Sequence, residues 1–123
     1  MYPFPPFTDL QFLIGLEVGQ ICLDPWSTQF RFADGGSIAV MGPFEHLDTQ
    51  ARRHHHQNTD LQDRGAVFLR ELIQQQITGL EVDKQRLVLS FRNGSTLTIF
   101  SEDIPYESGQ IYPPGREHKP IVF

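Results

Sequence analysis

Several features that would place a protein in a class at once are rare or absent in this chain of 123 residues. There is one cysteine, Cys22, so no internal disulfide can form, and we expect a reduced, cytoplasmic environment. Apolar runs reach only a few residues, far short of the roughly 20 needed to span a bilayer. Residues 1–7 contain no Lys or Arg and are broken by prolines, so they lack the charged and apolar regions of a secretion signal. These absences predict a soluble, cytoplasmic protein with no membrane partner.

Basic residues are also few, with 10 Lys and Arg against 15 Asp and Glu and a net charge of -5. A DNA duplex carries one phosphate charge per roughly 1.7 Å, so a surface of this charge would repel nucleic acid. The chain also has no phosphate loop, dinucleotide fingerprint, zinc-binding cysteine pair or nucleophile elbow. We therefore expect a non-enzymatic protein without a cofactor, whose acidic balance serves solubility or attracts a basic protein partner.

The chain does contain an internal repeat. Residues 13–40 align with residues 72–99 at a constant offset, so that Phe32 corresponds to Phe91 and the turn residue Gly35 to Gly94. Two copies at such a long period predict a closed pair of half-domains related by a pseudo-twofold axis, rather than an open array of repeats.

Each copy carries the same irregularity and the same turn. In the first strand of each copy, apolar residues are spaced by three and then by two, which requires one extra residue, and we expect β-bulges near Gly19 and Gly79. The next two strands keep their apolar residues on one face only if a three-residue loop joins them. That loop places Gly35 and Gly94 where a positive φ is needed.

Helices are expected before each copy. Thr8 and Thr59, each followed three residues later by a glutamine, form capping boxes, and they predict helices from Asp9 to about Ile14 and from Asp60 to about Gln75. Short strands are expected at residues 106–112 and 119–123. The fold class is therefore α+β, a mainly antiparallel sheet from two repeated three-stranded meanders, each preceded by a helix. The single domain 1–123 divides into a first unit (8–48), an exposed connection (49–58), a second unit (59–107) and C-terminal strands (106–123).

Few side chains are candidates for a site. The run His54, His55 and His56 contains potential metal ligands, but adjacent residues diverge on a strand or helix, so we expect no metal site. The acidic segment near residue 105 forms either a solvated turn or a recognition patch for a partner. Trp26 either anchors a partner or covers one end of the core. The candidate partner-binding residues are Trp26, Glu102, Asp103, Tyr106 and Glu107.

The order of these motifs carries a resemblance. An apolar strand, then Phe-x-Asp/Asn-Gly and Ser/Thr-Ile/Leu, followed by Tyr106-Glu107-Ser108, resembles a family of small bacterial proteins of unknown function. Its members are similar to proteins encoded near polymorphic toxins, some of which act as immunity proteins. The resemblance implies a protein that binds and neutralises a basic toxin. Two alternatives stay open: a homodimer or scaffold joined through an edge strand, and a small-ligand binder or enzyme that uses the cleft between the two halves.

Overall fold

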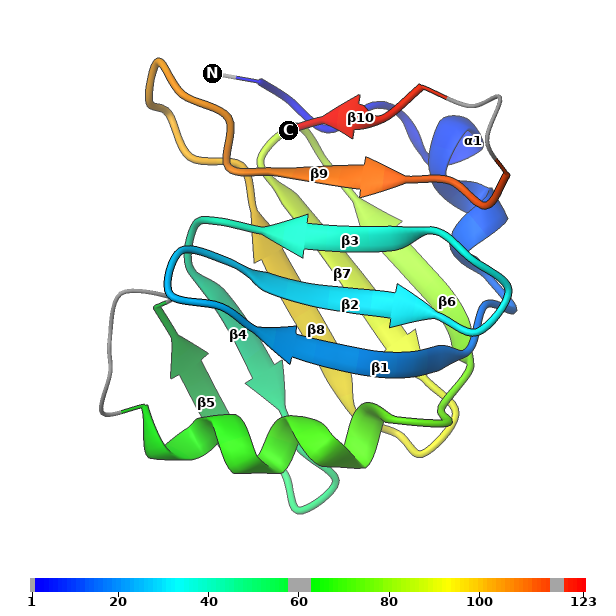
Figure 1. Ribbon diagram of the computed structural model, residues 1–123, viewed down its shortest axis with the longest axis vertical. Helices are drawn as coiled ribbons and strands as arrows, with labels where there is room; N and C mark the ends of the chain where they lie inside the picture. Colours follow the sequence, from blue (N-terminus) through cyan, green and yellow to red (C-terminus); the bar gives the residue numbers. More distant parts are fainter. Residues whose placement is uncertain (1, 58–62, 116–118) are drawn as a thin grey trace.

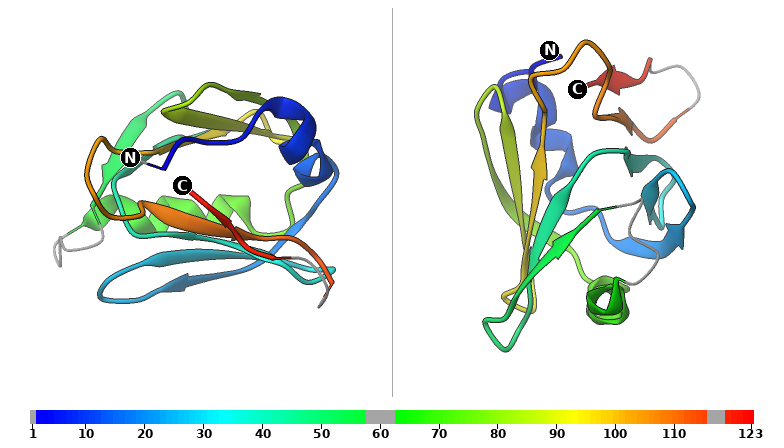
Figure 2. Two further views of the ribbon diagram at one scale, coloured as in Figure 1. Left: turned by 90° about the horizontal axis from the view of Figure 1, so that it is seen from above. Right: turned by 90° about the vertical axis from the view of Figure 1, so that its left-hand side faces the viewer.

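The computed structural model describes residues 2–57, 63–115 and 119–123. The chain folds as an α+β protein whose main elements are two antiparallel five-stranded sheets (Figure 1). The sheets lie as two layers with one apolar core between them (Figure 2). The antiparallel α+β class predicted from the sequence is thus confirmed. Within the described residues, no helix is long and apolar enough to cross a membrane.

Each sheet combines a three-stranded meander with a hairpin from a distant part of the chain. The first sheet has the order β1 (Val18–Leu23), β2 (Thr28–Phe32), β3 (Ser37–Val40), β9 (Gly109–Tyr112), β10 (Ile121–Val122). The second has the order β5 (Arg53–His56), β4 (Phe44–Leu47), β8 (Thr96–Phe100), β7 (Arg86–Phe91), β6 (Ile77–Val82). The hairpin β4–β5 follows β3 along the chain but joins β8, and β9–β10 follows β8 but joins β3. The two meanders therefore exchange hairpins.

The bulges and turns lie where the residue spacing predicted them. The pairing of β1 with β2 shifts between Val18 and Gln20, and that of β6 with β7 shifts between Ile77 and Gly79. Phe30 pairs with Ile38 and Leu89 with Leu97, as three-residue loops require. The glycines of these loops have φ values of 92° at Gly35 and 91° at Gly94, a region that residues with a Cβ rarely adopt.

The helices differ from those predicted. The first is a short α-helix, α1 (Phe7–Leu10), continued by a 3₁₀ turn, η1 (Gln11–Leu13), and its N-cap is Pro6, without a side-chain cap. The capping box predicted at Thr8 is wrong, because the helix begins at Phe7, two residues before the predicted Asp9, and Thr8 lies within it.

The second helix is a 3₁₀ helix, η2 (Arg64–Leu72), which ends before the predicted Gln75. The chain leaves the helical path at Ile73, whose ψ is 132°, and Gln74 follows with a φ of 69°. The capping box predicted at residues 59–62 lies outside the described residues.

The predicted exposed connection at residues 49–58 is also wrong in part, because it contains β5, which pairs with β4 along its whole length. β5 itself has no β-branched residue and no Phe, Tyr or Trp, so its composition gave no sign of a strand. At the C-terminal side, the strand predicted from residue 106 begins only at Gly109. The last strand, β10, pairs with β9 and extends the first sheet.

Candidate functional site

Three turns leave the first sheet at the same end. Leu23 pairs with Thr28, Thr28 with Val40, and Val40 with Gly109, so these residues form a row across four strands. The turns beyond this row, residues 24–27, 41–43 and 101–108, together form what we call the loop end, on the left in Figure 1. The backbone N–H groups of Met41 and Gly42 both donate to the carbonyl oxygen of Ser108, at 2.8 and 3.1 Å, which joins two of the turns.

All five predicted partner-binding residues lie on the loop end. The largest aromatic side chains there are Trp26, 75% exposed, and Tyr106, 73% exposed. Trp26 therefore does not cover one end of the core, the alternative role expected for it. Glu102, Asp103 and Glu107 lie on the same turn as Tyr106, and the Glu107 carboxylate accepts a hydrogen bond from Gln110 at 3.0 Å. The loop end thus presents exposed aromatic rings beside carboxylates.

A second group of polar residues lies between the β4–β5 hairpin and η2, where His46 and His56 are buried. His46 on β4 lies opposite His54 on β5, and His56 lies opposite Phe44. Because strand residues alternate between faces, His54 and His56 both point inward while His55 points outward, 3.6 Å from Glu45. The ring centroids of His46 and His54 are 5.7 Å apart, and those of His54 and His56 are 6.3 Å apart. We call His46, His54 and His56 the histidine cluster.

Each histidine of the cluster is hydrogen-bonded to a different carboxylate. His46 Nε2 lies 2.9 Å from Glu71 Oε1, His54 Nε2 lies 2.8 Å from Asp48 Oδ2, and His56 Nδ1 lies 2.5 Å from Asp63 Oδ2. Glu71 belongs to η2, Asp63 immediately precedes it, and Asp48 follows β4. The His46–Glu71 and His56–Asp63 pairs tie β4 and β5 to η2, and the His54–Asp48 pair joins β5 to the turn that follows β4.

The helix η2 also packs directly on the cluster. The ring of Phe68 stacks on His54 with centroids 4.6 Å apart, and the guanidinium of Arg52 lies 4.5 Å from the centre of the Phe68 ring. Gly65 permits this close approach, because a Cβ at that position would lie 3.1 Å from His54 Nδ1.

Burial and hydrogen bonding act on the charges of the cluster. Burial lowers the pKa of His46 below its ordinary 6.5, and the neighbouring Glu71 carboxylate, which acts in the opposite direction, does not offset the effect. Burial alone would raise the pKa of Asp48. Hydrogen bonds from His54 and from the backbone N–H groups of Arg52 and Gln50, together with the charge of Arg52, instead hold that pKa well below its usual range. At neutral pH His46 is therefore neutral and Asp48 is ionised.

Two nitrogen atoms of the cluster are buried without a hydrogen-bond partner in the described part of the chain, His46 Nδ1 and His56 Nε2. Across residues 2–57, 63–115 and 119–123, no group of three His, Cys, Asp or Glu side chains is arranged to hold a metal ion. From the sequence, only the three successive histidines stood out as a group. The inward pair of His54 and His56 could have been predicted from the alternation of a histidine-rich strand, but His46 was not among the predicted residues.

A cavity of about 320 Å³ opens beside the histidine cluster, between the turn after β1 and the start of η2. His56, Asp63 and Asp24 line it together with apolar residues that include Pro25, Phe44 and Leu69. Asp24 accepts hydrogen bonds from Gln29 at 2.9 Å and from Ser27 at 3.4 Å. The cavity thus combines one imidazole and two carboxylates with apolar walls.

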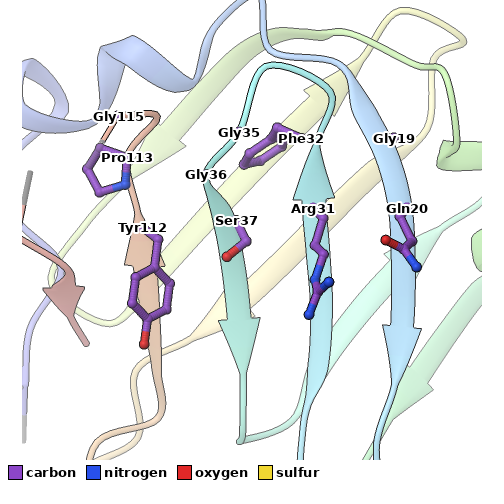
Figure 3. Close-up of a pocket in the computed structure, with 10 residues that line it drawn as sticks. All are labelled: Gly19, Gln20, Arg31, Phe32, Gly35, Gly36, Ser37, Tyr112, Pro113 and Gly115. Atoms are coloured by element: carbon purple, nitrogen blue, oxygen red, sulfur yellow. The ribbon is translucent and has the colours of Figure 1, made fainter.

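A wider and shallower cavity of about 810 Å³ lies at the opposite end of the first sheet (Figure 3). Gln20, Arg31, Ser37 and Tyr112 follow one another there on four neighbouring strands. The β2–β3 turn touches the chain after β9, because a Cβ on Gly36 would lie 2.6 Å from the carbonyl oxygen of Tyr112. None of the residues predicted to form a site lines this cavity.

Comparison with known proteins gives no family for the chain: no family model, no curated protein and no solved structure matches it.

Proposed function

We propose that this protein is a non-enzymatic, protein-binding domain that engages a basic partner through the loop end. The exposure of Trp26 and Tyr106 on the loop end, beside three carboxylates, is the observation that carries the proposal. Tryptophan and tyrosine are the residues most enriched among those that dominate binding energy at protein interfaces. Carboxylates around such anchors favour a positively charged partner and speed its association.

We further propose a role as a bacterial immunity protein that neutralises a basic toxin in the cytoplasm. Support comes from the net charge of -5 and from the resemblance of the turn motifs to small proteins encoded near toxins. On this proposal the partner is the product of a neighbouring gene.

The experiment is binding and rescue with the purified product of the adjacent gene. Trp26→Ala and Tyr106→Ala should each weaken binding by roughly 30-fold or more and abolish protection of cells that express the toxin. Tyr112→Ala, an exposed aromatic at the opposite end of the first sheet, is the matched control and should bind normally. Absence of binding and of rescue with every neighbouring gene product would remove this proposal.

A homo-oligomeric scaffold is a second candidate, supported by the edge strands. β1 and β6 lie at the edges of their sheets, and each is six residues long, so each is an edge to which a strand of another copy can add. Sedimentation at high protein concentration separates the candidates, since a strict monomer rules out this one.

We also propose that the two meanders, each with its preceding helix, are copies of one duplicated unit. The offset that aligns Phe32 with Phe91 in the sequence also relates the bulges and the strand pairings of the two meanders. On this proposal, the hairpins β4–β5 and β9–β10 are corresponding elements that have diverged.

A further inference from the structure

We propose that the 320 Å³ cavity beside the histidine cluster binds an organic cation, a guanidinium or ammonium group on a short apolar stem, through His56, Asp63 and Asp24. This inference does not depend on the protein-binding proposal, because a free cation would bind in the absence of any partner protein.

The first argument is the state of His56, whose side chain is 2% exposed. Its Nδ1 lies 2.5 Å from Asp63 Oδ2, and an ionised carboxylate can only accept a hydrogen bond, so this contact selects the ring tautomer with the proton on Nδ1. Nε2 then carries a lone pair, and it is buried without a partner in the described residues. A buried acceptor left unpaired is costly, and His56 lines the cavity, so a ligand N–H group that reaches this nitrogen would satisfy it.

The second argument is the charge of the cavity. Asp24 and Asp63 both line it, and no Lys or Arg is found among the described residues of its wall. Asp63 holds His56 and Asp24 binds only neutral side chains, so neither carboxylate has a cationic partner in the described structure. Negative charge in a partly enclosed site attracts a cation more strongly than the same charge in open water.

The third argument is the shape of the remaining wall. Phe44 stacks on His56 with ring centroids 4.7 Å apart, and Leu69 and Pro25 complete an apolar surface. A volume of 320 Å³ is near the lower limit of small-ligand sites, which hold about 300–1,000 Å³. The site therefore fits a short stem that ends in a charged group of several N–H donors.

A guanidinium or ammonium group on an apolar stem can come from a free amine or guanidine, or from the basic side chain of a protein. Asp24 and Pro25 belong to the same turn as Trp26, so the cavity opens beside the loop end. A partner that binds the loop end could therefore present an arginine or lysine to the cavity.

The experiment is an NMR titration of the isotope-labelled full chain with three probes at constant ionic strength. The probes are agmatine, a capped Gly-Gly-Arg-Gly-Gly peptide, and the same peptide with citrulline, the uncharged analogue of arginine. We expect saturable shifts of the His56 ring resonances with agmatine, and at least tenfold weaker binding of the citrulline peptide than of the arginine peptide. Binding of agmatine alone identifies a site for free cations, and binding of both cations identifies a site that also accepts a side chain.

Variants test the residues. Asp63→Asn and Asp24→Asn should each weaken agmatine binding at least tenfold, whereas Asp34→Asn, an exposed carboxylate in the β2–β3 turn at the other end of the sheet, should leave it unchanged. Asp24 is exposed, so its substitution tests the charge of the site even if Asp63→Asn does not fold. The inference is overturned if no probe gives saturable shifts at His56, if the citrulline peptide gives saturable shifts there with the affinity of the arginine peptide, or if folded Asp24→Asn binds agmatine like the unsubstituted protein.

Discussion

The hairpins β4–β5 and β9–β10 occupy equivalent places in the two sheets but have opposite chemistry. Each follows one meander along the chain and pairs with the last strand of the other. The inward face of β9–β10 is apolar, with Ile111 and Phe123 fully buried. The inward face of β4–β5 carries His46, His54 and His56, each bonded to a carboxylate.

Close packing explains how β9–β10 is held. Phe123 stacks on Phe4 with centroids 4.6 Å apart, and its ring lies directly over Gly109. Its carbonyl oxygen accepts hydrogen bonds from the backbone N–H groups of Ser108 and Gly109, at 2.5 and 3.1 Å. This hairpin stabilises the fold by removing apolar surface from water.

The β4–β5 hairpin is held differently. Its buried imidazoles need polar partners, which η2 and the adjoining turns supply, and two ring nitrogens still have none in the described structure. Phe44 is fully buried on the same face, but the imidazoles beside it gain little from burial, and the proposed cation site adjoins them. The difference between the hairpins can be tested by four substitutions, which follow from the largest expected effect to the smallest.

Phe123→Ala should lower the free energy of unfolding by about 3–5 kcal/mol, because it removes a fully buried ring from the apolar hairpin. Urea denaturation followed by circular dichroism measures the change. Val67→Ala on η2, where the side chain is 68% exposed, is the control and should change stability by less than about 0.5 kcal/mol. A small loss for Phe123→Ala would mean that β9–β10 contributes no more to stability than the polar hairpin.

Gly109→Ala should cost about 1–3 kcal/mol by overpacking the same hairpin. The added Cβ would lie 2.3 Å from both the Ala39 carbonyl oxygen and Phe123 Cζ, so the backbone would have to shift. Gly79→Ala in β6 is the matched control, because a Cβ there meets nothing within 4 Å. Equal thermal stability of the two alanine variants would contradict the packing described for β9.

His46→Leu should change the free energy of unfolding at pH 7 by no more than about 1 kcal/mol, because a buried polar group is replaced by an apolar one. Glu71 keeps its hydrogen bonds from the backbone N–H of Thr49 at 3.1 Å and the Thr49 hydroxyl at 2.9 Å. The converse substitution on the apolar hairpin, Ile111→His, should lower the free energy of unfolding far more, since no carboxylate pairs with that position in the described structure.

The pH dependence of His46→Leu gives a second readout. The fold lowers the pKa of His46 below 6.5, so the unfolded chain binds a proton first as the pH falls through 6.5. The contribution of neutral His46 to the free energy of unfolding is therefore fully present above this pH. It declines below this pH, by at most about 1.4 kcal/mol per pH unit for one proton. Denaturation from pH 7.5 to 5 should show a shallower decline for His46→Leu. Glu71, His54 and His56, which face His46, are unchanged in this variant. If stability fell equally steeply with pH in the variant and the unsubstituted protein, His46 would have the same pKa in the folded and unfolded chains.

Arg53→Ala should have the smallest effect, about 0.5 kcal/mol or less, because it removes an exposed ion pair from the outer face of β5. The Arg53 guanidinium lies 2.8 Å from Glu45 Oε2, and its side chain is 63% exposed. A double-mutant cycle with Glu45→Gln isolates the pair. A coupling energy well above 1 kcal/mol would place the stability of β4–β5 on its outer face and not in the histidine cluster.

Local features of the fold were predictable. The bulges at Gly19 and Gly79 follow from the spacing of apolar residues, and the turns at Gly35 and Gly94 follow from the need to keep one face dry. Both depend on residues close together in the chain. The strand β5 was not predictable in this way, because its histidines have no strong strand propensity and its partner β4 supplies the pairing.

Some of the candidate residues could likewise be predicted from the sequence, and others could not. Trp26, Tyr106 and the neighbouring carboxylates could be named from their types and their positions in turns, but the row of strand pairings brings the two turns to one end. The histidine cluster depends on carboxylates that are distant in the sequence, such as Glu71 for His46.

The sequence by itself determined the alternation, the bulges and the glycine turns, because these depend on steric limits of a few adjacent residues. Only the tertiary structure decided which meander each hairpin joins and which hairpin carries buried imidazoles. That choice depends on burial and on hydrogen bonds between distant segments, whose free energies exist only once η2 has packed on β4 and β5.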